Sequence, residues 1–184
     1  NNLNILDVGC GGGLLCEPLS RLGGNVTGID VSENAIITAK HHASKMGLKI
    51  NYICTSLEEL NLKKDFDLII ASEVIEHVLD RKYFLKMIRK ISSNKTSFVF
   101  TTINKSISSL IFGKFAAEYI LNLIPKGTHD WEKFVTPQKL YLEALENGIY
   151  LNNFSGLTPN VFNKEFNLTS YLGINYAASG IVRV

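Results

Sequence analysis

The sequence has few residues of the kinds that special environments require. It holds three cysteines with no Cys-x-x-Cys pair, one tryptophan and four histidines. An odd number of such cysteines excludes a disulfide framework and indicates reduced thiols in a reducing compartment. No run of about 18 apolar residues is free of charge, so no segment is expected to cross a bilayer. The formal net charge of +2 is too small to indicate nucleic acid as a partner.

What is present fits one folded domain. The 184 residues are 46% hydrophobic and 20% charged, an ordinary composition for a domain with a sizeable core. We therefore expect a single domain over residues 1–184. The chain begins at Asn1, without Met and directly on the first expected strand, so we expect the true N-terminus to be missing.

Short β-branched runs alternate with amphipathic segments along the chain. This alternation predicts βαβ units and an α/β fold around a mostly parallel sheet. Strands are expected over 4–9, 25–30, 49–54, 66–72 and 97–102, with extended chain at 149–157 and a last strand at 174–178. Helices are expected over 14–22, 32–46, 80–91 and 137–148.

The first expected strand runs into Asp7-Val8-Gly9-Cys10-Gly11-Gly12-Gly13, hereafter the glycine loop. Glycines at the end of a strand let backbone N–H groups approach a ligand that side chains would exclude, although tight turns also need glycine. Asp30 ends the second strand about 20 residues further on, where a carboxylate can accept both hydroxyls of a ribose. Dinucleotide sites use Gly-x-Gly-x-x-Gly, so glycines spaced by twos disfavour a nicotinamide oxidoreductase.

The fourth expected strand ends in Ser72-Glu73-Val74-Ile75-Glu76-His77, hereafter the acidic turn. Such positions line the ligand crevice of an open α/β sheet. Glu73, Glu76 and His77 have i, i+3, i+4 spacing, so one helical turn would aim all three side chains the same way. This predicts a site for magnesium or another divalent metal. Two other interpretations stay open, namely solvated glutamates beside a packed histidine, and a general base without metal.

The stretch from Ser106 to Phe134 is too long for a simple connection. Alternating three- and four-residue spacing predicts an amphipathic helix that ends at Pro125. This helix either packs on the core, dips its apolar face into a membrane, or covers a greasy substrate. Its apolar residues are Phe112, Phe115, Ala116, Tyr119, Ile120 and Leu123, and the basic residues able to meet anionic head groups are Lys105, Lys114 and Lys126.

His129, Asp130 and Trp131 follow within one short loop. Their proximity indicates either a second site or a polar loop closed by a packed tryptophan.

Together, DVGCGGG, SEVIEHV and AEYILNLIPKGTHDWEKF resemble the ubiquinone-biosynthesis O-methyltransferase family of bacteria and mitochondria, over residues 4 to about 178. The resemblance implies a Rossmann-like class I methyltransferase fold. Its mostly parallel sheet would have about seven strands, the last antiparallel, with helices on both faces. A helical insertion would follow strand five at 106–134. The family also has a preceding segment with an arginine that contacts the cofactor, so we expect this chain to bind the cofactor weakly or to be inactive.

The implied activity is methyl transfer from S-adenosylmethionine to a phenolic hydroxyl of polyprenylated catechol and demethylated quinol intermediates. Two alternatives stay open: a methyltransferase for another small acceptor, and a non-catalytic, membrane-docked scaffold subunit. The implied partners are anionic membrane lipid at 106–134 and other ubiquinone-biosynthesis proteins. The implied location is cytoplasmic and peripheral on the bacterial inner membrane, or the matrix side of the membrane in a mitochondrion.

The resemblance also assigns roles to residues. Cofactor contacts fall on Asp7, Gly9, Gly11, Asp30, Ser56, Leu57 and Ser72, with adenine near Ser56 and Leu57. Magnesium ligands fall on Glu73, Glu76 and His77. A metal there would stabilise phenolate, which makes Glu76 and His77 candidate catalytic residues. His129, held by Asp130, is a second candidate for the base.

Overall fold

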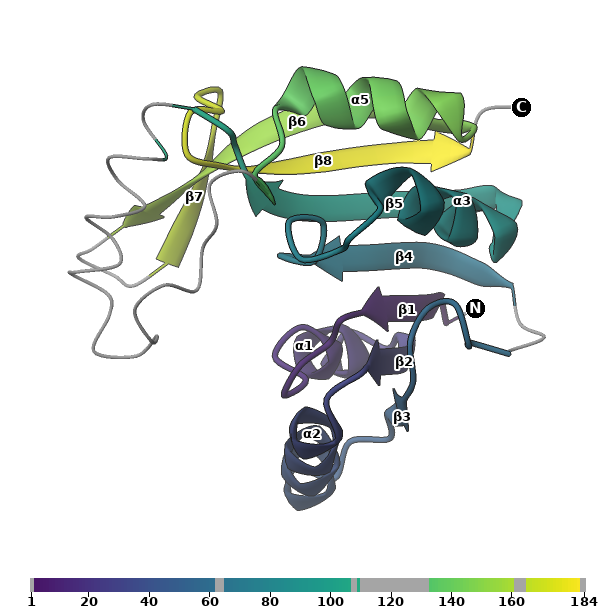
Figure 1. The fold of residues 1–184 in the computed structure, drawn as a ribbon. Helices are drawn as coiled ribbons and strands as arrows, with labels where there is room; N and C mark the ends of the chain where they lie inside the picture. Colours follow the sequence, from purple (N-terminus) through teal and green to yellow (C-terminus); the bar gives the residue numbers. More distant parts are fainter. Residues whose placement is uncertain (1, 62–64, 107–108, 110–132, 161–164, 183–184) are drawn as a thin grey trace.

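Eight strands form one sheet in the order β3-β2-β1-β4-β5-β8-β6-β7 (Figure 1). The structure, a computed structural model, describes residues 2–61, 65–106, 109, 133–160 and 165–182. The strands are β1 (Asn4–Val8), β2 (Asn25–Asp30), β3 (Asn51–Cys54), β4 (Phe66–Ser72), β5 (Ser92–Ile103), β6 (Ile149–Asn160), β7 (Glu165–Thr169) and β8 (Asn175–Val182). The helices described over their whole length are α1 (Cys16–Arg21), α2 (Glu33–Lys45), α3 (Arg81–Lys90) and α5 (Pro137–Glu146).

The pairing of the strands confirms the expected α/β fold. Strands β1 to β5 pair in parallel, whereas β8 runs antiparallel to β5 and β6 runs antiparallel to both β7 and β8. The strand that the sequence did not predict is β7, which makes eight rather than about seven. Its sequence, EFNLT, has no β-branched run, and its Phe166 and Leu168 are exposed, so it lacks the usual apolar signal.

Hydrophobic side chains form one cluster on each face of the sheet. Successive residues of a strand point to opposite faces, and Leu6 belongs to one cluster while Ile5 belongs to the other. The first cluster contains buried residues of α3 and α5, and the second contains residues of α1 and α2. The sheet is therefore covered by helices on both faces, as predicted.

Three of the expected helices begin at side-chain caps. Ser32, Asp80 and Thr136 each accept the backbone N–H three residues further on, which satisfies a free donor of the first turn. The helix expected over 14–22 is shorter than predicted, because α1 covers only Cys16–Arg21. Leu14 and Leu22 are 89% and 85% exposed, so the predicted apolar stripe does not face the core at either end.

The chain reverses direction through the sheet between β1 and β4. From β1 it proceeds outward to β2 and β3, and then returns to the other side of β1 with β4 and β5. The loops after β1 and β4 therefore leave the same edge of the sheet toward opposite faces, and ligands bind at such a switch point. In Figure 1 the arrows of β1 and β4 both point to the left, so their carboxyl ends face the same side.

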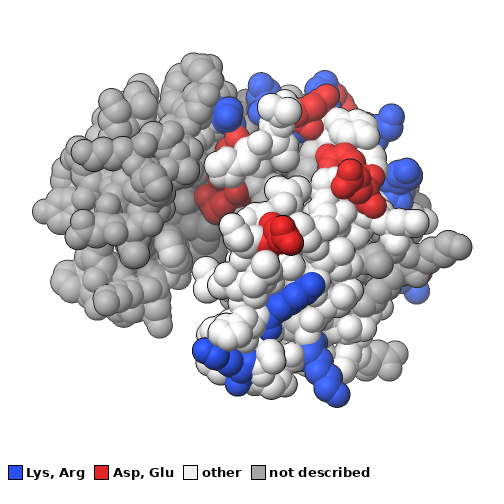
Figure 2. Space-filling model, turned by 60° about the horizontal axis from the view of Figure 1, so that its bottom comes forward, with Lys and Arg blue, Asp and Glu red and all other residues white. Residues whose placement is uncertain are grey.

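In the part of the chain that is described, no helix combines the length and the apolar character needed to cross a membrane. On the face shown in Figure 2, basic and acidic side chains are interspersed among neutral ones. Among the described residues of that face, neither charge stands alone. Most of the insertion expected at 106–134, including its amphipathic helix, lies outside the described residues.

Candidate active site

The glycine loop connects β1 to α1 through a left-handed backbone. Gly9, Gly11 and Gly13 have φ values of +70°, +51° and +86°. A Cβ on Gly9 would lie 2.5 Å from Val74 Cγ2, and one on Gly13 would lie 2.2 Å from the Tyr52 hydroxyl. A Cβ on Gly11 would meet nothing within 4 Å. Two glycines thus pack against protein, while the backbone at Gly11 faces open space that a ligand can enter.

Asp30 ends β2 beside the glycine loop. One of its carboxylate oxygens accepts the backbone N–H of Gly11 at 2.8 Å, and the other accepts that of Ser32 at 2.8 Å. These bonds hold the carboxylate between the loop and the start of α2. Since each oxygen has a second lone pair, Asp30 can still accept the hydroxyl protons of a ribose. The predicted cofactor residues Gly11 and Asp30 are thus in direct contact.

Asp7, the first residue of the glycine loop, is buried below its glycines and is only 2% exposed. Burial raises its pKa to about 6; the hydrogen bond from the Cys16 thiol, 3.2 Å from Oδ2, opposes this rise, and the charge of Asp30 adds to it. The neighbouring Cys10 thiol and burial raise the pKa of Cys16 far above its usual range, so Cys16 stays a protonated donor. Asp7 therefore carries its negative charge under the loop only above about pH 6.

Ser56 and Leu57, the residues expected near adenine, follow β3. The backbone N–H of Thr55 donates to the carbonyl of Asp30 at 3.0 Å, which ties this segment to the end of β2. Ser56 Oγ accepts the N–H of Glu59 at 3.3 Å. The Leu57 side chain is 4% exposed and packs in the core, so its backbone is the part left to meet a ligand.

The acidic turn leaves β4 with a backbone conformation that is rare outside glycine. Glu73 has a φ of +55°, and its N–H donates to the Thr101 carbonyl at 3.0 Å and to Thr101 Oγ1 at 3.2 Å. The Thr101 hydroxyl donates to Glu73 Oε1 at 2.9 Å and lies 2.9 Å from Ser72 Oγ. Left-handed residues of this kind persist where surrounding contacts enforce them, and they cluster at functional sites.

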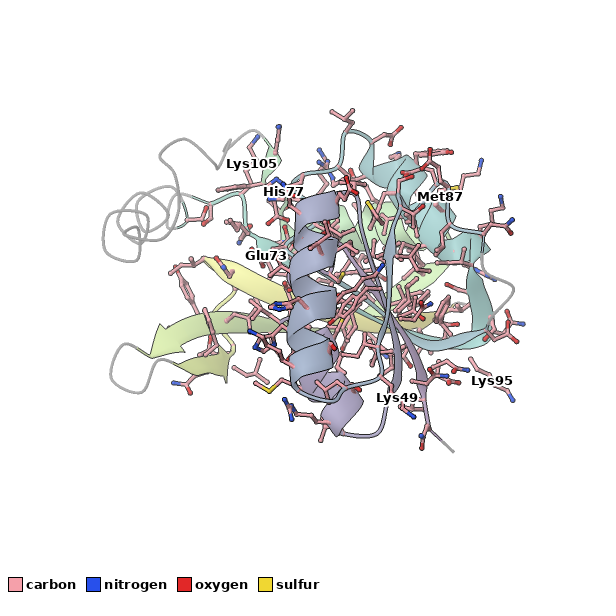
Figure 3. The ribbon with its side chains drawn as sticks, turned by 90° about the horizontal axis from the view of Figure 1, so that it is seen from below. Lys49, Glu73, His77, Met87, Lys95 and Lys105 are labelled. Carbon is pink, nitrogen blue, oxygen red and sulfur yellow. The ribbon has the colours of Figure 1, made fainter. Side chains whose placement is uncertain are left out.

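The expectation that one helical turn aims Glu73, Glu76 and His77 the same way is wrong. Glu76 is 2% exposed and its Oε2 accepts the Thr102 hydroxyl at 2.7 Å, whereas His77 is exposed. The left-handed backbone at Glu73 interrupts the helical path, so the next residues form a turn in which Glu76 points inward and His77 outward. In Figure 3 Glu73, His77 and Lys105 lie left of centre, on the side where β4 and β5 end.

The two glutamates are close enough to influence each other. Burial and the Glu76 carboxyl raise the pKa of Glu73 to about 7, against the opposing hydrogen bond from Thr101. Glu76 Oε1 is buried and has no hydrogen-bond partner within the described ranges. Buried carboxylate oxygens suit a divalent cation, yet the described residues contain no group of three acidic, histidine or cysteine side chains able to hold one. The predicted set of three magnesium ligands, Glu73, Glu76 and His77, is therefore not assembled among the described residues.

Thr101 and Thr102 are residues of this site that the sequence reasoning missed. The one signal for them is that an alternating apolar strand, Phe98 to Ile103, ends in two adjacent hydroxyls. His129 and Asp130, the second candidate base and its partner, lie outside the described residues.

The sheet order, the glycine loop and the acid that ends β2 define a class I methyltransferase. A family model described as a methyltransferase domain matches residues 6–100, which include the glycine loop and the acidic turn. Among solved structures, magnesium protoporphyrin IX methyltransferase from Synechocystis with bound SAH has a TM-score of 0.73 and 19% identity, covering 100% of this chain and 75% of that one. At this identity the likeness shows the fold alone.

Closer relatives define the family. The ubiquinone biosynthesis O-methyltransferase of Bradyrhizobium diazoefficiens is 42% identical over 182 residues, 98% of this chain and 72% of the relative. That of Pelagibacter ubique is 43% identical over 175 residues, 95% of this chain and 73% of the relative. The chain belongs to the ubiquinone biosynthesis O-methyltransferase family, as its motifs predicted.

Proposed function

We propose that this chain transfers the methyl group of S-adenosylmethionine to a phenolic hydroxyl of a polyprenylated catechol or demethylated quinol. The observation that carries the proposal is the contact between the two candidate half-sites. A Cβ on Gly9 would lie 2.5 Å from Val74 Cγ2, so the glycine loop abuts the middle of the acidic turn. A donor held by the loop and an acceptor held by the turn would therefore be neighbours.

The sulfonium of the donor already makes its methyl carbon electrophilic. The protein has to orient a phenol oxygen in line with the carbon–sulfur bond and help that oxygen lose its proton. As the new oxygen–carbon bond forms, the carbon–sulfur bond breaks and its electron pair stays on sulfur. The phenol proton passes to a carboxylate of the acidic turn, Glu73 or Glu76. Asp30 would hold the ribose, and Asp7 in β1 and Ser72 at the end of the neighbouring β4 would lie toward the methionine end.

The proposal includes a magnesium ion bound by the carboxylates of Glu73 and Glu76. When bound, it would supply positive charge that stabilises a phenolate. The support is the buried Oε1 of Glu76, which lacks a partner among the described residues, together with the neighbouring Glu73 carboxyl.

We further propose that the chain works at a membrane surface, because a polyprenylated phenol is confined to a bilayer. The surface would be the inner membrane of a bacterium, or the matrix side of the membrane in a mitochondrion. The apolar and basic residues of 106–134 support a contact with anionic lipid, and Lys105 lies with Glu73 and His77 on the side where β4 and β5 end (Figure 3). Other ubiquinone-biosynthesis proteins are the expected protein partners.

The test is a methylation assay on a short-chain prenyl catechol, with the methyl ether detected by mass spectrometry. Glu76→Gln should lower kcat by about a hundredfold or more, because it removes a carboxylate beside the acceptor. Glu146→Gln, on the exposed side of α5, is the matched control and should keep wild-type kcat. Folded Glu76→Gln that turns over at the wild-type rate would refute the carboxylate role.

The same assay separates the other possibilities. A rate that survives EDTA would remove magnesium from the proposal and leave the carboxylates in place. Equal rates with a soluble catechol, and no gain from lipid vesicles, would indicate a different small acceptor. Tight binding of S-adenosylmethionine without any methylated phenol would indicate a scaffold subunit.

A further inference from the structure

Two adjacent threonines of β5 hold the acidic turn from opposite faces of the strand. Successive side chains of a strand alternate, and Thr102 shares the buried face of Phe98 and Phe100, while Thr101 lies on the other face. The Thr101 hydroxyl bonds to Glu73, and the Thr102 hydroxyl bonds to Glu76. The acidic turn thus wraps over the end of β5, with one glutamate fastened on each side.

The hydroxyl protons around Thr101 have a defined direction. While the Glu73 carboxyl is ionised, Thr101 donates its one hydroxyl proton to Glu73 Oε1, so it must accept from its other partners. Those partners are the N–H of Glu73 at 3.2 Å and the Ser72 hydroxyl at 2.9 Å. Ser72 then donates its hydroxyl proton to Thr101, so toward a ligand the Ser72 oxygen can only accept a hydrogen bond. One threonine in this way fixes a carboxylate, a left-handed backbone and the polarity of a predicted cofactor residue.

Thr102 is the one described hydrogen-bond donor to the buried Glu76 carboxyl. Thr102 is 0% exposed and Glu76 is 2% exposed, and the bond between them is 2.7 Å long. Leaving a buried carboxyl without its hydrogen bond costs free energy. The carboxyl would therefore move or change its ionisation. The place of Glu76 beside the acceptor therefore depends on this hydroxyl.

We propose that Thr101 and Thr102 are positioning residues for methyl transfer, Thr101 acting through Glu73 and Ser72, and Thr102 acting through Glu76. The inference rests on the proposed function, in which the acidic turn faces the phenol. Neither threonine touches a reacting atom. Each sets the direction of a carboxylate that does.

The chain offers a closely matched control for Thr102. Thr96 lies on the same face of β5, is also 0% exposed, and donates to the carbonyl of Phe66 at 2.7 Å. It lies toward the other end of the strand, away from Glu73 and Glu76. Thr96→Val and Thr102→Val therefore remove equivalent buried hydrogen bonds from one strand, only one of which belongs to the site.

The experiment measures kcat, KM for the prenyl catechol, Kd for S-adenosylmethionine by calorimetry, and the thermal midpoint. Thr102→Val should lower kcat by about tenfold to a hundredfold without changing the Kd, since it removes one hydrogen bond to a carboxylate that acts in the transition state. Thr101→Val should lower kcat similarly, and it should raise the Kd for S-adenosylmethionine several-fold because Ser72 loses its partner. Thr102→Ser and Thr101→Ser, which keep the hydroxyl, should restore most of the activity. Thr96→Val should lower the thermal midpoint and keep kcat.

A double-mutant cycle tests whether Thr102 acts through Glu76. Thr102→Val should have little further effect on kcat in a Glu76→Gln background, because both changes act on one carboxylate. Wild-type kcat in Thr102→Val and Thr101→Val, or losses that Thr96→Val matches, would overturn the inference alone. If Thr102→Val does not fold, Thr101→Val, at a half-buried position, tests the inference by the same measurements. A wild-type chain that binds S-adenosylmethionine but methylates no phenol would overturn the proposed function, and this inference with it.

Discussion

The glycine loop and the acidic turn touch each other but are built from different interactions. The loop is shaped by backbone: left-handed glycines set its path, and Asp30 accepts the N–H groups of Gly11 and Ser32. The acidic turn is shaped by side chains that reach across two strands, such as Ser72 and Thr101, 29 residues apart in sequence. A methyl-donor site built from backbone is compatible with many kinds of neighbouring acceptor site. The proposed methyl-acceptor site, built from side chains, can change without any change to the sheet.

The largest expected effect is on cofactor binding, which we expect to depend more on the glycine loop and Asp30 than on the acidic turn. Asp30→Ala should raise the Kd for S-adenosylmethionine by about a hundredfold to ten-thousandfold, because two hydrogen bonds between a carboxylate and the ribose are lost. Calorimetry measures it directly. Asp67→Ala is the matched control, since Asp67 also accepts a backbone N–H at 2.8 Å, from Asn4, but at the opposite end of the sheet. Similar Kd values for the two variants would contradict the role given to Asp30.

The second effect tests whether the loop is specified by backbone. Gly13→Ala should lower the free energy of unfolding by about 3 to 4 kcal/mol, combining a left-handed alanine with overpacking against the Tyr52 hydroxyl, 2.2 Å from the new Cβ. Gly47 has a similar φ of +67° but open space around its Cβ, so Gly47→Ala should cost only about 1 to 2 kcal/mol. Denaturant unfolding measures both. Equal losses would mean that Tyr52 yields freely and that packing does not fix the loop.

The third effect concerns the buried charge under the loop. Burial raises the pKa of Asp7 to about 6 in the folded chain, from an ordinary value of 3.8 in the unfolded chain. Between these values the folded state binds more protons than the unfolded state, so stability falls as pH rises from about 4 to about 6. Relative to Asp7→Asn, which cannot ionise, the wild-type chain should lose about 2 to 3 kcal/mol over this window. If the free energies of unfolding of the two proteins change equally with pH, the burial of this carboxylate is contradicted.

How much the sequence could predict follows the same division. The glycine loop, Asp30 and the caps of α2, α3 and α5 are local signals, in which a residue and its hydrogen-bond partner lie close in sequence. The family was likewise identified from continuous motifs. The sequence could not show that Glu76 is buried and His77 exposed, because the i, i+4 argument assumes a helix and the left-handed Glu73 prevents one.

Contacts between strands were beyond the sequence for a physical reason. Nothing near Thr101 or Thr102 indicates that their hydroxyls meet glutamates 26 to 28 residues earlier; that contact exists only once β4 and β5 pair. In the same way, Leu14 and Leu22 read as core residues by spacing, while their exposure depends on where α1 begins and ends. The acceptor half of the site is therefore the part for which a structure adds the most.

The smallest effect asks whether the acidic turn depends on the helices beneath it. Arg81, which begins α3, donates to both carboxylate oxygens of Glu143 on α5, at 2.9 and 3.2 Å, and both side chains are largely buried. Glu143→Gln keeps the shape but removes the charge, so it should cost about 1 kcal/mol of stability, measured by denaturant unfolding. Glu146→Gln, which breaks an exposed pair with Lys82, should leave stability unchanged. Because the hydrogen bonds of Glu143 go to Arg81, and those of Thr101 and Thr102 go to Glu73 and Glu76, Glu143→Gln should leave kcat intact. A fall in kcat comparable to that of Thr102→Val would instead show that the pairing of α3 and α5, and not β5, sets the carboxylates.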